Sequence, residues 1–134
     1  MLDNEGGEDV KARLSAAQFV LTSDLTLIEC DRVLHRAAAL GELSAAEAAT
    51  RRTLLSTLAE HWVVFAIDGE MSQRARQVFP REPIRTLDAI HIAAALVIRN
   101  LVTGLQFLTL DERIRGNAVD LGFEVVPGDG ATVL

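Results

Sequence analysis

The chain has 134 residues, of which 49% are apolar, and this is enough to bury one hydrophobic core and too much for a disordered tail. No apolar stretch approaches the length of a membrane-spanning helix, and the acidic start MLDNEGGEDV differs from a secretory signal. With a single cysteine, Cys30, these features predict a cytoplasmic protein. The net charge of -6 argues against nonspecific coating of nucleic acid, so any such role must be local or use a bridging cation.

The hydrophobic pattern predicts helices and strands in alternation along the chain. The expected helices are 8–17, 24–40, 45–59, 69–79, 87–99 and 112–121. The expected strands are 18–22, 62–67, 106–110 and 123–126. Strands that alternate with helices are typical of an α/β fold with a mostly parallel sheet. Because helix 87–99 is apolar nearly all round, we expect it to be mostly buried.

Several residues are expected to begin or end these helices. Ser44 and Glu47 have the spacing of a capping box, in which each side chain satisfies a backbone N–H group of the other residue. Gly41 and Gly122 are placed to end helices. Side-chain caps are also expected from Asp24, Asp68 and Thr86.

Three acids stand out because ligands of open α/β sheets bind beyond the carboxyl ends of the strands. Asp111 directly follows strand 106–110 and shares a strand face with Thr109. Asp88 lies in the first turn of the apolar helix 87–99, and Glu29 lies between apolar residues of helix 24–40. A buried carboxylate is costly unless it is paired, so Asp88 and Glu29 need partners.

Each of these residues also has a structural interpretation. Asp111 is well placed to cap helix 112–121, and Asp88 would interact favourably with a helix dipole. Glu29 has Arg32 three residues later, which suits an exposed ion pair. His91 shares a helix face with Asp88 and suits either a general base or, more simply, packing beside the acid. Both interpretations stay open for each residue.

Three segments, in this order and spacing, resemble the PIN-domain family and within it the VapC-type toxins of bacterial toxin–antitoxin pairs. They are TSDLTLIECDRVLHR, RTLDAIHIAAAL and FLTLDERIRGNAVDLGFEVV. The resemblance covers about residues 5 to 127 and leaves 128–134 as a tail. It implies a PIN-like three-layer α/β fold and a cytosolic metal-dependent endoribonuclease. It also implies an antitoxin partner, and we expect a homodimer.

The resemblance implies a site in which Glu29, Asp88 and Asp111 hold Mg²⁺ or Mn²⁺ and Thr109 accompanies the last acid. The physics agrees, because Mg²⁺ takes oxygen ligands and relieves the repulsion between clustered carboxylates. Four arginines near the expected strand ends are candidates for RNA phosphate contacts, although ordinary surface arginines would lie there too. They are Arg81, Arg85, Arg113 and Arg115.

The sequence departs from the family at its start. Members of the family open with a central strand that ends in an aspartate, whereas only Met1 to Asn4 precede the matching segment here. Either Asp3 replaces the missing acid, or the sequence has a start set too far downstream, is a fragment or is a degenerate copy. As given, the chain is expected to have weak nuclease activity or none. The alternative function is a truncated PIN-like module that binds an antitoxin or dimerises without cleaving RNA. A plain α/β scaffold with helix-capping acids is the third interpretation.

Overall fold

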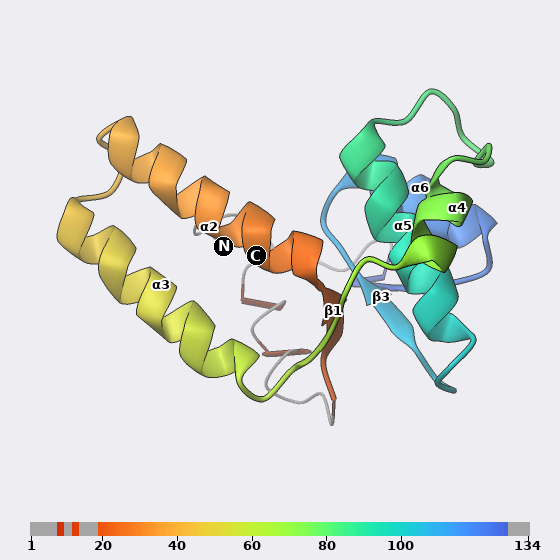
Figure 1. The fold of residues 1–134 in the computed structure, drawn as a ribbon, viewed down its shortest axis with the longest axis horizontal. Coiled ribbons are helices and arrows are strands. Elements are labelled where there is room, and N and C mark those ends of the chain that lie inside the picture. Colours follow the sequence, from red (N-terminus) through yellow and green to blue (C-terminus); the bar gives the residue numbers. More distant parts are fainter. Residues whose placement is uncertain (1–7, 10–11, 14–18, 129–134) are drawn as a thin grey trace. The chain divides into compact units, whose positions relative to one another are not determined.

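The computed structural model describes residues 8–9, 12–13 and 19–128, and these residues form two compact units (Figure 1). The smaller, which we call the hairpin unit, comprises Phe19–Ala66. The larger unit, as far as it is described, consists of residues 8–9, 12–13 and 67–128. Residues 8–9 and 12–13 are helical. The expectation concerning Asp3 lies outside the described residues.

The hairpin unit consists of two parallel strands joined by two helices. In chain order it holds β1 (Leu21–Ser23), α2 (Asp24–Ala39), α3 (Ala45–Ala59) and β2 (Val63–Phe65). Leu21 lies opposite Val63, and Ser23 lies opposite Phe65. Helices α2 and α3 run side by side as an elongated pair (Figure 1). Their small core is formed by Leu34, Ala37, Leu43 and Ala48.

The larger unit contains the second parallel strand pair. Its elements are α4 (Gly69–Ala75), α5 (Thr86–Arg99), β3 (Gln106–Leu108), α6 (Glu112–Asp120) and β4 (Glu124–Val126). Strands β3 and β4 are connected through α6 and pair with Leu108 opposite Val126. Helix α5 packs against α4 and α6. The core of this unit consists of Phe79, Ala89, Ile92, Ala93 and Ile114.

The predicted α/β class and the parallel strand pairing are confirmed. The strands are shorter than expected, and they form one two-stranded sheet in each unit. Helix α5 is buried as predicted, since Ile92, Ala94 and Val97 are buried and both Ile90 and Leu96 are half-buried. Most of its apolar side chains are therefore covered, and Leu87, at its start, is exposed.

The capping box is confirmed, since the Glu47 backbone N–H donates to Ser44 Oγ at 3.0 Å and the Ser44 N–H donates to Glu47. Asp68 also caps its helix as predicted, by accepting from the Met71 N–H at 2.9 Å. Gly122 has a φ of 89°, which favours glycine at a helix end.

One predicted helix end and two predicted caps are wrong. Arg85 has extended backbone angles and occupies the N-cap position of α5, so Thr86 is already helical and is no cap. Ser23 has the same role before α2, which places Asp24 in the first turn, where it interacts with the helix dipole. Helix α4 ends at Ala75 and not near Phe79, because the Phe79 side chain is buried while its N–H donates to Glu82 at 2.9 Å.

Candidate functional site

Asp88 is a buried carboxylate at the start of α5, and only 5% of its side chain is exposed. It is held by the guanidinium of Arg85. Arg85 Nε donates to Asp88 Oδ2 at 3.1 Å, and Nη2 donates to Oδ1 at 3.3 Å. Two donors on one carboxylate make this a bidentate, charge-assisted contact. The prediction that this acid is buried and needs a partner is thus confirmed, and its partner lies three residues earlier in the chain.

Asp111 is the N-cap residue of α6 and follows β3 after Thr109 and Leu110. Its two carboxylate oxygens have different partners. Oδ1 accepts from the Arg113 backbone N–H at 2.9 Å, which is the capping role expected of an aspartate at this position. Oδ2 lies 3.9 Å from Arg85 Nη2. Thr109 fixes the backbone of this residue, because its Oγ1 accepts from the Asp111 N–H at 3.1 Å. The capping interpretation is therefore correct, and it leaves one oxygen directed at a cation.

Asp88 and Asp111, which we call the acid pair, therefore share one cationic group. They come from two different helices, and the Arg85 guanidinium contacts both carboxylates. Two carboxylates beside one cation repel each other less than they would without that positive charge. The Arg85 side chain is 63% exposed, so solvent reaches the guanidinium. The geometry is that of a small cation site open on one side.

Buried polar bonds hold the loop that leads to Arg85. The side chain of Asn117, on α6, is 1% exposed and forms two bonds with the backbone of Arg81. The Arg81 N–H donates to Asn117 Oδ1 at 2.8 Å, and Asn117 Nδ2 donates to the Arg81 carbonyl at 3.0 Å. Glu82 accepts from the Ile84 N–H at 3.1 Å. These bonds fix the loop, and hence the point from which Arg85 reaches the acid pair.

Gly116 allows Arg81 to lie across α6. A Cβ atom at this glycine would come within 3.0 Å of the Arg81 Cζ atom. The guanidinium passes over the glycine and pairs with Asp120, with Nε at 2.7 Å from Oδ2. Neither Gly116 nor Asn117 is among the residues predicted to contribute to the site. A signal was present, since Gly and Asn side by side within a helix are poor helix formers and point to another role.

The four arginines predicted to contact RNA have different environments. Arg81 is engaged with Asp120, and the hydrogen bond between them lowers the pKa of the Asp120 carboxyl. Arg115 is buried and donates to the Thr109 carbonyl at 3.1 Å, which supports the end of β3. Arg85 and Arg113 are exposed at the starts of α5 and α6. Arg85 contacts the acid pair, and Arg113 is exposed two residues after Asp111.

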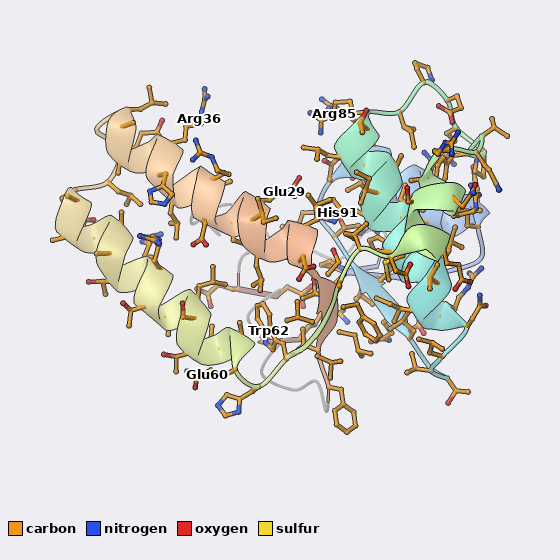
Figure 2. All side chains as sticks on the ribbon, viewed as in Figure 1. Glu29, Arg36, Glu60, Trp62, Arg85 and His91 are labelled. Carbon is orange, nitrogen blue, oxygen red and sulfur yellow. The ribbon has the colours of Figure 1, made fainter. Side chains whose placement is uncertain are left out.

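The third predicted acid, Glu29, belongs to the hairpin unit. It lies on α2 and is half-buried, and Figure 2 shows its side chain leaving this helix. Its approach to the acid pair remains a prediction. At the start of the same helix, Ser23 Oγ is buried and has no hydrogen-bond partner among the described residues. Burial raises the pKa of the thiol of Cys30, the residue after Glu29, which agrees with packing of Cys30 as a small apolar side chain.

His91 follows Asp88 by almost one turn of α5 and is half-buried (Figure 2). This position agrees with the shared helix face predicted for the two residues.

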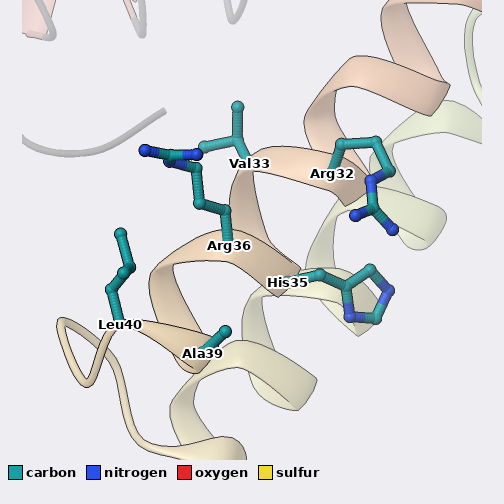
Figure 3. A pocket seen from close by; sticks show the side chains of 6 residues that line it. All are labelled: Arg32, Val33, His35, Arg36, Ala39 and Leu40. Carbon is teal, nitrogen blue, oxygen red and sulfur yellow. The ribbon is translucent and has the colours of Figure 1, made fainter.

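The hairpin unit also has an open hollow along α2 (Figure 3). Basic and apolar side chains from the outer part of the helix line it. They are Arg32, Val33, His35, Arg36, Ala39 and Leu40. Such a mixed lining suits contact with an acidic, partly apolar partner more than it suits chemistry.

The donor set of the acid pair fits a divalent metal ion. Mg²⁺ and Mn²⁺ prefer carboxylate oxygens, and Mg²⁺ is commonly bound through one or two carboxylates while it keeps several waters. The guanidinium that contacts both carboxylates marks where a positive charge is stabilised. Among residues 8–9, 12–13 and 19–128, no group of three or more His, Cys, Asp and Glu side chains is arranged to hold a metal. The acid pair supplies two carboxylates, and metal binding by them remains a prediction.

Within the described part of the chain, no helix combines the length and apolar character needed to cross a membrane.

Comparison with known proteins identifies the family. Among curated proteins, none matches the sequence. The family model of the PIN domain matches residues 1–119, which is most of the chain and includes both members of the acid pair. PIN domains are generally nucleases that use divalent metal ions. The chain therefore belongs to the PIN-domain family.

Proposed function

We propose that this protein is a metal-dependent endoribonuclease of the VapC type, the toxin of a type II toxin–antitoxin pair, acting in the cytoplasm. One observation carries the proposal: Asp88 and Asp111 come from different helices and bind the same cationic group. Membership of a nuclease family and the resemblance of three segments to VapC-type toxins support it. The acid pair lies at the carboxyl end of β3, where α/β proteins bind their ligands.

In this proposal Asp88 and Asp111 hold Mg²⁺ or Mn²⁺, with Glu29 as the third carboxylate. When bound, such an ion lowers the pKa of a water and neutralises charge on a scissile phosphate. Burial in the first turn of α5 keeps Asp88 in one orientation. Thr109 has a positioning role, because its hydroxyl fixes the backbone from which the Asp111 carboxylate projects.

The proposed RNA contacts are Arg85, which contacts the acid pair, and the exposed Arg113, two residues after Asp111. Arg81 and Arg115 support the same region from within the fold, through Asp120 and the Thr109 carbonyl. A chain with a net charge of -6 gains little from long-range attraction to RNA. Local arginines and a bound cation would supply the positive charge that the substrate needs.

The proposal is tested by an RNA cleavage assay on the purified chain, with Mn²⁺ titrated and with excess EDTA. We expect cleavage only with the metal. Asp88→Asn should reduce the rate by at least about 100-fold, because loss of even an indirect metal-site residue commonly costs 10–100-fold. Glu112→Gln is the matched control, since it removes one exposed negative charge beside Asp111 and should retain activity.

Far-UV circular dichroism of both variants separates a lost site from a lost fold. Cleavage that persists in EDTA, or an equal loss in Asp88→Asn and Glu112→Gln, would contradict the proposed site.

A second candidate function, a binding module without activity, is favoured by the surface of the hairpin unit. Large apolar side chains are exposed along the helical hairpin of this unit. Single exposed apolar side chains are ordinary on protein surfaces, whereas a group of them marks a contact surface. They are Ile28, Val33, Leu40, Leu54 and Leu58. An antitoxin segment or a second copy of the chain would cover them. Self-association in sedimentation velocity, together with no RNA cleavage at any Mn²⁺ concentration, would favour this function over the nuclease.

A further inference from the structure

Arg85 occupies an unusual place for an arginine. It is the N-cap residue of α5, a position where Ser, Thr, Asp and Asn are preferred because their oxygens accept from the helix. An arginine has no acceptor, and its side chain forms no cap bond here. Its guanidinium instead bends along the first turn and binds Asp88, with Asp111 at 3.9 Å. The residue therefore serves the acid pair and not the helix end.

We infer that Arg85 is a built-in counter-ion of the acid pair and that a divalent cation must displace it in order to bind. The inference rests on the proposed function, because it concerns the same site. Arg85 satisfies both oxygens of Asp88 and faces Oδ2 of Asp111, which are the atoms that a metal would use. Guanidinium and metal are both positive, so at such distances in a partly buried site they repel each other strongly.

The two partners of the ion pair differ in how easily they move. The Asp88 side chain is 5% exposed and is confined by the buried first turn of α5, whereas the Arg85 side chain is 63% exposed. Asp111 is also fixed, because one of its oxygens caps α6. Arg85 can therefore turn into solvent without opening the core, while the carboxylates stay in place. Displacement leaves a preformed pair of oxygen ligands.

This exchange has a consequence for the protein without metal. The guanidinium holds the Asp88 carboxylate in one orientation, and it lowers the affinity of the acid pair for cations by competition. The apparent affinity for the metal is reduced by the fraction of molecules in which Arg85 is displaced, so a higher metal concentration is needed to fill half of the sites. Arg85 would thus set the metal concentration at which the site fills.

The test is isothermal titration calorimetry with Mn²⁺ alone on the full chain and on Arg85→Gln. We expect Arg85→Gln to bind Mn²⁺ about tenfold more tightly, because a competing charge-assisted hydrogen bond is removed. Arg85→Lys should lie between the two, since lysine keeps the charge without the bidentate geometry. The matched control Arg76→Gln removes an exposed arginine of the same unit and should leave the affinity unchanged. A purely structural Arg85 would give weaker binding on substitution, never tighter.

A second measurement uses the unmodified chain, so it does not depend on how well a variant folds. The Nε–H signal of Arg85 in a nitrogen-15 NMR spectrum should move toward the position of solvent-exposed arginines as Mg²⁺ is added. Equal or weaker Mn²⁺ binding by Arg85→Gln, or an unmoved Arg85 signal at saturating Mg²⁺, would overturn the inference.

The outcomes distinguish this inference from the proposed function. Tighter Mn²⁺ binding by Arg85→Gln without RNA cleavage by the unmodified chain supports the exchange and rejects the nuclease. Metal-dependent cleavage with equal Mn²⁺ affinities of the two proteins supports the nuclease and rejects the exchange.

Discussion

The hairpin unit is held by a few small apolar side chains, whereas the larger unit combines an apolar core with buried polar bonds between distant segments. Leu34 is the largest fully buried side chain of the hairpin unit. In the larger unit, Ile92 and Ala93 are fully buried, and Asn117 ties α6 to a loop 36 residues away in the chain. The difference indicates which part of the molecule needs precisely positioned side chains. Charged groups must be positioned closely, and buried hydrogen bonds position a loop better than apolar contact alone.

Core truncations should have the largest effect and test the difference directly. Leu34→Ala and Ile92→Ala each remove a side chain that is 0% exposed, at an expected cost of about 2–5 kcal/mol in the free energy of unfolding. Chemical denaturation followed by circular dichroism measures both. The single tryptophan, Trp62, lies in the hairpin unit and reports on that unit by fluorescence.

We expect Leu34→Ala to lower the free energy of unfolding more than Ile92→Ala does. The small hairpin core has few side chains that can move into the cavity. Leu54→Ala is the control, since it removes an exposed side chain from α3 and should change stability little. A cost below about 1 kcal/mol for Leu34→Ala would show that the hairpin core contributes less than its burial indicates.

Removal of the buried amide should have the next largest effect. Asn117→Ala leaves the N–H and carbonyl of Arg81 without their partners, at an expected cost of about 2 kcal/mol. Hydrogen exchange of the Arg81 amide should also accelerate, since its acceptor is lost. Asn100→Ala, at the exposed end of α5, is the matched control and should be within about 0.5 kcal/mol of the unmodified chain. Equal effects of the two substitutions would argue that the loop is held by other contacts.

The pair of Arg81 and Asp120 should have the smallest effect, because it is exposed to solvent and screened. The hydrogen bond from Arg81 lowers the pKa of Asp120, so its contribution is fully present above the ordinary aspartate pKa of about 3.9. It is lost as the pH falls through the lower pKa of the folded state. Thermal unfolding of the unmodified chain and of Asp120→Asn should therefore differ slightly at neutral pH and converge in acid. A difference that grows in acid would contradict this assignment.

Local patterns predicted much of the secondary structure. The capping box of Ser44 and Glu47, the cap at Asp68 and the burial of α5 depend on residues within a few positions of one another, and they are confirmed. The predictions that are wrong also concern residues only a few positions apart. Arg85 and not Thr86 precedes α5, because the side chain at this position is recruited by Asp88, and a capping preference cannot express that.

The candidate site was only partly readable from the sequence. An aspartate in the apolar context of α5 signalled a carboxylate in need of a partner, and the position of Asp111 beyond β3 signalled a strand-end acid. The sequence did not predict that the Arg85 guanidinium contacts both acids. The two acids lie 23 positions apart, and their approach depends on how α5 and α6 pack.

By itself, the sequence determined the class of the fold, the parallel strand pairing, most helix ends and the family to which the chain belongs. Hydrophobic periodicity and capping are properties of short segments, and these features follow from them. Only the tertiary structure decided that Arg115 is buried beneath Thr109, that Asn117 holds the Arg81 loop and that Arg85 serves the acid pair. Each of these contacts fixes one polar group on another, and packing must first bring the elements that carry them together.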